Sequence, residues 1–241
     1  MTLRDRPLRR LASVLVVLIG TGCWLAFRAA TWQTTNFVIT SQRVIFRQGL
    51  IAKRGIADVL RRELQRPAYR PELIALGTVT DAYQPVEREL RLSRAVLEVL
   101  ATAQHPVTIV TKGSGVERDI DLLAPMAARG LAAVHVTITT LDARLARALE
   151  PRAAAPHRRL RTIRTLADAG IPVGVSVSPQ IPFINTDLEQ VLEAAYEAGA
   201  RRAFYQVLRL PWELSPMFRQ WLDQHYPDRA ARVMGRVQDL R

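Results

Sequence analysis

The sequence predicts an α/β domain with a parallel sheet, barrel-like or doubly wound, preceded by one transmembrane helix and a short β-hairpin. Three observations lead to this fold class. From Ala57 onward, short apolar segments typical of strands alternate with longer segments whose apolar residues recur at helical spacing. Glycines such as Gly170 and Gly199 stand where helices should end. Strands that alternate with helices in this way are expected to pair in parallel through right-handed crossovers.

Composition limits the possible functions. The chain has 241 residues, with 34 Lys and Arg against 22 Asp and Glu, for a net charge of +12. This excess suggests anionic partners such as nucleic acid, phosphates or acidic lipid, or else an arginine-rich proteome. The one cysteine, Cys23, excludes an intrachain disulfide and any zinc or iron–sulfur site built from this chain's cysteines. The four histidines are too widely spread to suggest a metal cluster.

The N-terminal segment has two competing interpretations. A basic stretch, residues 1–10, precedes an uncharged run from Leu11 to Phe27, which residues up to 30 can extend to the ~20 residues of a spanning helix. We predict a transmembrane anchor at 11–30, which makes the membrane a partner and leaves the α/β domain facing the cytoplasm. A signal peptide is the alternative, because a basic start and an apolar middle fit it as well.

Residues 31–56 predict a β-hairpin. Alternating apolar residues at Thr35–Thr40 and at Arg43–Ile51 indicate two strands around a polar turn. The run from Thr34 to about Gly55 resembles the opening strands of bacterial PH-like domains. Two strands alone bury too little apolar surface to be stable. The hairpin must therefore pack on the rest of the protein or stay loosely ordered.

Residues 57–241 carry the alternation of helices and strands. The first helix, Ala57–Gln65, is ended by Arg66 and Pro67. The predicted strands are Leu73–Leu76, Val107–Thr111, Val134–Thr139, Val173–Ser178 and Ala203–Leu208. The predicted helices between them are about Val86–Ala103, Glu117–Arg129, Leu141–Leu149, Arg158–Ala169 and Leu188–Ala198. Trp212, Phe218 and Trp221 then recur at roughly helical spacing, and we interpret them as core residues of a last helix rather than a platform for substrate.

Polar residues gather where each predicted strand ends. Gly77-Thr-Val-Thr-Asp81 follows the first strand, and Thr111-Lys-Gly-Ser114 follows the second. Hydroxyl, amide and charged side chains follow the other three strands in the same way. Ligands bind at the carboxyl ends of strands in parallel α/β folds, so the pattern predicts a ligand site at one rim. For the first loop the alternative is a turn in which Asp81 or Gln84 satisfies backbone donors.

Five motifs carry a resemblance to a known family: ALGTVTDAYQPVE, TIVTKGS, ITTLDARLARALEPRAAAPHRRLRTI, AGIPVGVSVSPQIPFIN and YQVLRLP. In this order and spacing they resemble radical SAM proteins of the group related to spore photoproduct lyase, which is DNA repair photolyase-like. The resemblance covers about residues 57–241. It implies a partial (β/α) barrel that lacks its first strand, S-adenosylmethionine and a [4Fe–4S] cluster as cofactors, lyase-like radical chemistry, and nucleic acid as a partner.

The resemblance also implies a binding role for nine residues at the strand ends. The amino group and ribose side of S-adenosylmethionine would be held by Thr78, Thr80 and Asp81, its ribose and carboxylate side by Lys112, Thr139 and Glu150, an anion by Arg152, and the adenine by Ser178 and Pro179.

The chain departs from the family pattern in its cysteines. Family members carry Cys-x-x-x-Cys-x-x-Cys after the first barrel strand, and these thiolates hold three irons of the cluster that supplies the electron for reductive cleavage. Here the predicted anchor and hairpin occupy that region. We therefore expect an S-adenosylmethionine-binding barrel without its own cluster, catalytically impaired or inactive as this chain stands, which leaves its status as an enzyme open. The alternative is a membrane-anchored PH-like binding module with a degenerate nucleotide pocket.

Overall fold

The computed structural model describes residues 35–39, 44–48 and 55–239. The chain divides into two units, Met1–Lys53 and Arg54–Arg241. The first unit contains β1 (Thr35–Ile39) and β2 (Val44–Gln48), which pair antiparallel. The predicted β-hairpin is therefore present as a two-stranded ladder, and the second unit is described by itself below.

The predicted transmembrane helix has to be corrected. In the part of the chain that the structure describes, no helix combines the length and the apolar character needed to cross a bilayer. Residues 11–30 themselves lie outside the described residues. The uncharged run in that segment is bounded by Arg10 and Arg28, which leaves it short of the ~20 residues that a spanning helix prefers. On this finding the fold class that begins with a transmembrane helix and the membrane-anchored, cytoplasm-facing localisation are wrong, and a membrane partner has no support.

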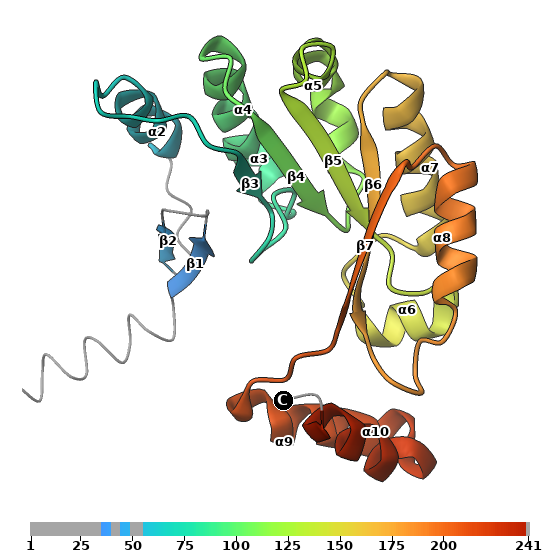
Figure 1. The fold of residues 1–241 in the computed structure, drawn as a ribbon. Helices are drawn as coiled ribbons and strands as arrows, with labels where there is room; N and C mark the ends of the chain where they lie inside the picture. Colours follow the sequence, from blue (N-terminus) through green and yellow to red (C-terminus); the bar gives the residue numbers. More distant parts are fainter. Residues whose placement is uncertain (1–34, 40–43, 49–54, 240–241) are drawn as a thin grey trace, which may run out of the picture. The chain divides into compact units, whose positions relative to one another are not determined.

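A five-stranded parallel sheet in the order β3-β4-β5-β6-β7 forms the second unit (Figure 1). Its strands are β3 (Ile74–Leu76), β4 (Val107–Thr111), β5 (Ala132–Thr137), β6 (Val173–Gln180) and β7 (Arg202–Val207). Each strand pairs with its neighbours in sequence, so the sheet advances in one direction and β3 and β7 are its edges. Two open edges are consistent with a partial barrel, as the sequence predicts.

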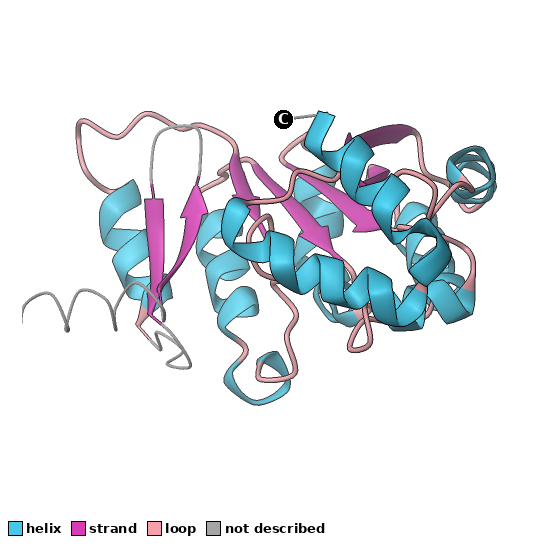
Figure 2. Ribbon diagram, turned by 90° about the horizontal axis from the view of Figure 1, so that it is seen from below, coloured by secondary structure: helices cyan, strands magenta, loops and turns pink. Residues whose placement is uncertain are grey.

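Four helices follow the first four strands of this sheet and pack on one of its faces (Figures 1 and 2). They are α4 (Leu92–Thr102), α5 (Ile120–Ala127), α7 (Pro156–Asp168) and α8 (Leu188–Glu197). The other helical segments are α2 (Ile56–Leu64), α3 (Glu87–Leu90), η1 (Gly115–Asp119), α6 (Ala143–Leu149), η2 (Trp212–Leu214), α9 (Ser215–His225) and α10 (Pro227–Asp239). We call the face of the sheet away from α4, α5, α7 and α8 the inner face.

Arg91 divides the helix that the sequence predicts over Val86–Ala103. Its φ of 45° is left-handed, which ends α3 and lets α4 begin at the next residue. Both carboxylate oxygens of Glu87 accept from the backbone amide of Ser93 at 3.0 Å, so Glu87 satisfies a donor in the first turn of α4. The apolar spacing continues across this break, which is why the sequence predicts a single helix.

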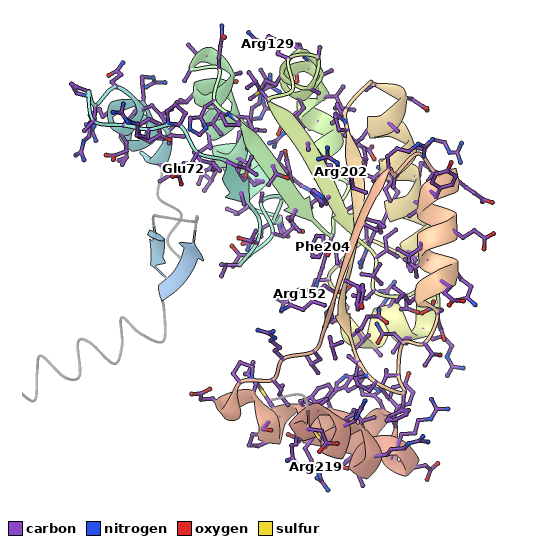
Figure 3. The ribbon with its side chains drawn as sticks, in the orientation of Figure 1. Glu72, Arg129, Arg152, Arg202, Phe204 and Arg219 are labelled. Carbon is purple, nitrogen blue, oxygen red and sulfur yellow. The ribbon has the colours of Figure 1, made fainter. Side chains whose placement is uncertain are left out.

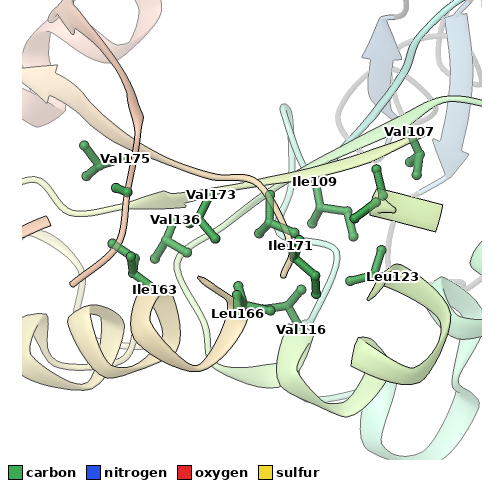
Figure 4. Packing of buried hydrophobic residues seen from close by; sticks show 14 of the residues in the cluster. Val107, Ile109, Val116, Leu123, Val136, Ile163, Leu166, Ile171, Val173 and Val175 are labelled. Carbon is green, nitrogen blue, oxygen red and sulfur yellow. The ribbon is translucent and has the colours of Figure 1, made fainter. Parts of the chain in front are cut away.

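The core lies between the sheet and its four covering helices. Ile109 of β4 and Val136 of β5 meet Leu123 of α5 and Ile163 and Leu166 of α7 (Figure 4). All five side chains are fully buried. Because side chains alternate along a strand, the residues between these positions point to the inner face. The alternation therefore places apolar side chains in the core and leaves the side chains between them, many of them polar, on the inner face.

A second hydrophobic cluster holds the C-terminal helices in place. Leu222 of α9 and Val233 of α10 are fully buried, and they pack together with Leu145 of α6. Phe218 and Trp221 pack against this cluster with stacked rings whose centroids lie 5.9 Å apart. The interpretation of these two aromatics as core residues is confirmed, whereas the side chain of Trp212 is outside the described ones.

His105, just after α4, contacts the segment that follows α2 through a hydrogen bond. Its titration should also make the stability of the folded state depend on pH. The hydroxyl of Tyr69 lies 2.6 Å from His105 Nε2, and His105 Nδ1 lies 3.0 Å from the carbonyl oxygen of Pro106. A neutral ring satisfies both bonds by donating from Nδ1 and accepting at Nε2. Burial lowers the pKa of His105 below its ordinary value of 6.5.

We expect the folded state to lose stability as the pH falls below about 6.5, because the unfolded chain then binds the proton that folded His105 resists. Urea denaturation at about pH 7.5 and about pH 5.5 should show a larger loss for the unaltered chain than for His105→Gln. An equal loss in the two proteins would contradict this role for His105.

Candidate functional site

A pocket of about 470 Å³ opens at the carboxyl ends of the strands, on the inner face of the sheet. Its wall runs from Gly77, in the loop after β3, to Gln206 on β7, and β4, β5 and β6 contribute residues between them. Five of the nine residues predicted from the sequence line it, namely Thr78, Asp81, Lys112, Ser178 and Pro179. We call this space the rim pocket. Its volume is within the ordinary range for small-molecule sites.

Gly77 allows the loop after β3 to pass directly beside β4. A Cβ atom at this position would lie 2.0 Å from the carbonyl oxygen of Val110, and the φ of Gly77 is +86°. Both the close approach and the backbone conformation require a residue without a side chain. The glycine therefore allows Thr78, Val79 and Asp81 to line the rim pocket.

Asp81 joins this loop to the end of β4 through its carboxylate. The Thr111 hydroxyl donates to Oδ1 and Oδ2 at 2.8 and 3.0 Å, and the Lys112 amide donates to Oδ2 at 2.7 Å. The backbone amide of Tyr83 donates to Oδ1 at 2.8 Å. Asp81 thus accepts from backbone amides, as the alternative interpretation of this loop predicts. The same contacts hold its carboxylate, a negatively charged group, in the wall of the rim pocket.

A chain of charges lies beside the pocket. Lys112 Nζ is 2.8 Å from Glu150 Oε1, and Arg159 Nη2 donates to Glu150 Oε2 at 2.6 Å. Arg159 is only 1% exposed, and it also donates to the carbonyl oxygens of Thr137 at 2.8 Å and Ala154 at 2.6 Å. A buried guanidinium with all these acceptors ties the end of β5 to the segment between α6 and α7. Glu150 in turn holds the position of the Lys112 ammonium group.

The remaining predicted residues do not line the rim pocket. Glu150 does not line the pocket, but it contacts Lys112, which does. Thr139 is buried, and its Oγ1 has no hydrogen-bond partner in the described part of the chain. Thr80 is partly buried in the loop after β3, and Arg152 is exposed in the turn after α6 (Figure 3). The structure therefore gathers five predicted residues at one pocket and leaves four around it.

A buried ion cluster supports the loop from behind. The Asp119 carboxylate is fully buried and forms ion pairs with the guanidinium groups of Arg94 and Arg118, at 3.0 Å each. The hydroxyl of Tyr83 also donates a hydrogen bond to this carboxylate at 3.0 Å. Burial raises the pKa of Tyr83 well above its ordinary value, and the neighbouring Asp119 charge raises it further. Tyr83 therefore remains a hydroxyl donor at any ordinary pH, and the loop that carries Asp81 is held to η1.

The aromatic side chain of Phe204 on β7 lines the rim pocket and is absent from the sequence-based prediction of the site. Thr137, Ser176 and Gln206 line the pocket as well, and they belong to the polar strand ends from which the site is predicted. The period of two along a strand could have identified Phe204, because it precedes Gln206 by two residues.

The residues present do not fit an iron–sulfur cluster. Cys23 is the one cysteine of the chain and lies outside the described residues. Among residues 55–239, no group of three or more His, Cys, Asp or Glu side chains is arranged to hold a metal ion. A [4Fe–4S] cluster of this family needs three thiolates, which this polypeptide cannot supply from its own sequence.

Comparison with known proteins gives two family matches. The model described as Radical SAM superfamily matches residues 48–196, and the model described as Bacterial PH domain matches residues 3–65. Both resemblances found in the sequence motifs are thereby confirmed. Among solved structures, spore photoproduct lyase complexed with dinucleoside spore photoproduct aligns with a TM-score of 0.41 at 16% identity, over 82% of this chain and 54% of that chain.

Curated relatives match a large part of the chain. An uncharacterized protein of Mycobacterium tuberculosis (strain ATCC 25618 / H37Rv) is 33% identical over 186 residues, covering 76% of this chain and 55% of the relative. An uncharacterized protein of Methanocaldococcus jannaschii is 29% identical over 155 residues, covering 64% and 57%. The chain thus spans about half the length of the curated relatives it matches. Because the first family model covers more than half of the sequence, this chain belongs to the radical SAM superfamily.

Proposed function

We propose that the rim pocket binds S-adenosylmethionine. When bound, this cofactor supplies an adenosyl group on a sulfonium centre that can be cleaved reductively. The proposal is supported above all by Asp81, whose fixed carboxylate offers a negative charge to the amino group of the cofactor. Lys112, held by Glu150, offers the opposite charge to its carboxylate.

Other residues that line the pocket would contact the ribose and the adenine of the cofactor. The hydroxyls of Thr78 and Ser178 are suited to the ribose, and the apolar ring of Pro179 is suited to the adenine. Thr80, Thr139 and Arg152 would take part only at the margin of the site, because they do not line the pocket. The charge set and the volume of the pocket both fit a small zwitterionic nucleoside.

We further propose that this chain does not carry out radical chemistry unaided. The single cysteine supports this, because the three thiolates expected of the family would have to come from elsewhere. Nucleic acid is proposed as a partner, supported by the net charge of +12. A PH-like segment at 31–56 and a partial barrel at 57–241 are the proposed domains, and the overlap of the two family matches at residues 48–65 supports a boundary there.

Isothermal titration calorimetry of the whole chain with S-adenosylmethionine tests the binding. We expect Asp81→Asn to weaken binding about tenfold or more, since a hydrogen bond to a charged group contributes about 1.5–3 kcal/mol. The matched control is Asp168→Asn, an exposed carboxylate at the end of α7, which should bind like the unaltered chain. Thermal unfolding of both variants will show whether Asp81→Asn is still folded.

Two outcomes would overturn different parts of this proposal. If the unaltered chain gives no heat with millimolar S-adenosylmethionine, cofactor binding is wrong. If the purified chain alone, under reductant, releases methionine and 5′-deoxyadenosine, the proposed catalytic impairment is wrong. A binding module without catalysis is the second candidate, favoured by the cysteine content, and binding without cleavage is the result expected for it.

A further inference from the structure

Two aromatic rings meet on the inner face of the sheet below the rim pocket. His135 of β5 and Phe204 of β7 come from strands that are not neighbours, yet their ring centroids lie 5.8 Å apart at an angle of 60°. Between them runs β6, whose residues at this level are Gly174, opposite His135, and Ser176, opposite Phe204. A Cβ atom at Gly174 would lie 2.5 Å from His135 Cδ2. Small residues on β6 therefore let the two rings meet.

His135 presents polar atoms on this wall. Its Nδ1 lies 3.3 Å from the hydroxyl oxygen of Thr108 on β4, which is on the same inner face. Burial lowers the pKa of His135, and the nearby charge of Arg202 lowers it further, so the ring is neutral at pH 7. A neutral imidazole has one donor and one acceptor nitrogen. The Thr108 hydroxyl lies at Nδ1, and Nε2 lies over Gly174, 2.8 Å from the place where a Cβ atom would stand, with no hydrogen-bond partner among the described residues.

Phe204 and Arg202 leave an apolar surface and a positive charge uncovered side by side. They are two residues apart on β7, so their side chains lie on the same face, and Figure 3 shows both on the side of β7 toward β5. Phe204 is 44% exposed, which is unusual for a side chain that lies inside a curved sheet. Arg202 is exposed and forms no ion pair with any described residue. Phe204 also lines the rim pocket, so this surface adjoins the pocket.

We propose that Thr108, His135, Arg202 and Phe204 form a second binding site, for a planar aromatic ring that carries a negatively charged group. The ligand ring stacks on the exposed face of Phe204, and its anionic group pairs with the Arg202 guanidinium. His135 Nε2 and the Thr108 hydroxyl hydrogen-bond its polar edge. The site shares Phe204 with the rim pocket but needs no bound cofactor, and the role of its ligand as the substrate of a radical SAM reaction rests on the function proposed above.

The test uses three small anions on the whole chain: benzoate, cyclohexanecarboxylate and inorganic phosphate. Binding is followed by NMR of the protein amides during titration. Benzoate and cyclohexanecarboxylate have the same charge and nearly the same size, and only benzoate is planar and aromatic. We expect benzoate to bind several-fold more tightly than cyclohexanecarboxylate, with shifts at Phe204 and His135, because ring stacking adds about 0.5–1.5 kcal/mol to burial.

Matched variants on the two faces of β7 locate the site. Phe204→Leu should remove the preference for benzoate, and Arg202→Gln should weaken binding of both carboxylates about tenfold. Tyr205→Leu and Arg201→Gln are the controls, because Tyr205 is 63% exposed on the opposite face of the same strand and Arg201 contacts the Tyr196 ring on α8. These controls should leave the benzoate affinity unchanged.

The outcomes separate this inference from the proposed function. Equal affinity for the two carboxylates, binding of phosphate as tight as that of benzoate, or loss of affinity in the Tyr205→Leu control would overturn the second site. A chain that fails to bind S-adenosylmethionine but keeps the benzoate preference would refute the proposed cofactor and leave the second site standing. A chain that binds S-adenosylmethionine but shows no preference for benzoate would refute the second site and leave the proposed cofactor standing.

Discussion

Replacing Gly77 with alanine is expected to destabilise the protein by about 3 kcal/mol or more and to abolish binding at the rim pocket. The new Cβ atom would lie 2.0 Å from the carbonyl oxygen of Val110, so either the loop or β4 must move. A φ of +86° adds the cost of a left-handed backbone for a residue with a side chain. Guanidinium denaturation measures the stability, and calorimetry with S-adenosylmethionine measures the pocket.

Gly130→Ala is the matched control for this substitution. Gly130 also has a positive φ, +71°, but no heavy atom lies within 4 Å of the place where its Cβ would stand. It should therefore lose only about 1 kcal/mol, the cost of the backbone conformation. If the two alanine variants lose the same stability, the close approach between the loop and β4 is not what Gly77 provides.

Arg159→Met is expected to cost about 3–5 kcal/mol, because it leaves the Glu150 carboxylate without its buried partner. The same change removes donors from the carbonyl oxygens of Thr137 and Ala154. Chemical denaturation provides the measurement. Arg161→Met, an exposed residue on the same helix, should change stability by no more than about 0.5 kcal/mol.

A double variant tests the electrostatic cause. Adding Glu150→Gln to Arg159→Met removes a carboxylate charge that keeps only the partly exposed Lys112 as its partner, so part of the lost stability should return. If the double variant is no more stable than Arg159→Met alone, the loss comes from packing rather than from the carboxylate that has lost its buried partner. The affinity for S-adenosylmethionine should fall in the double variant, since Lys112 there loses the carboxylate that positions it.

The order of strands and helices could be predicted from the sequence because each segment has a clear apolar period. The misplaced boundaries have physical causes. The strand predicted over Val134–Thr139 is β5, Ala132–Thr137, because the ladder to β4 begins at Ala132, a residue with little preference for strands. Thr139 therefore lies two residues beyond the strand end, and it is not among the residues that line the rim pocket.

The site could be predicted only in outline. Polar strand ends placed Thr78, Asp81, Lys112 and Ser178 at one pocket, because parallel strands bring their carboxyl ends together. No local pattern could reveal that Arg159, in the middle of a helix, is buried against Glu150. Such a contact depends on how α7 docks against the sheet. The left-handed Arg91 is likewise invisible to periodicity, since α3 and α4 share one apolar stripe.

The strand order of the sheet bears on the sequence of events during synthesis. Every strand pairs with the one made just before it, so each ladder can form as soon as the next helix and strand emerge from the ribosome. The three-residue β3 can form only a short ladder with β4, whereas β4, β5 and β6 share longer ones and can hold together first. Because the rim pocket draws its wall from the loop after β3 and from the four strands β4 to β7, it becomes complete only when β7 has joined. The rim pocket is therefore a feature that the nascent chain acquires late, after most of its core is already in place.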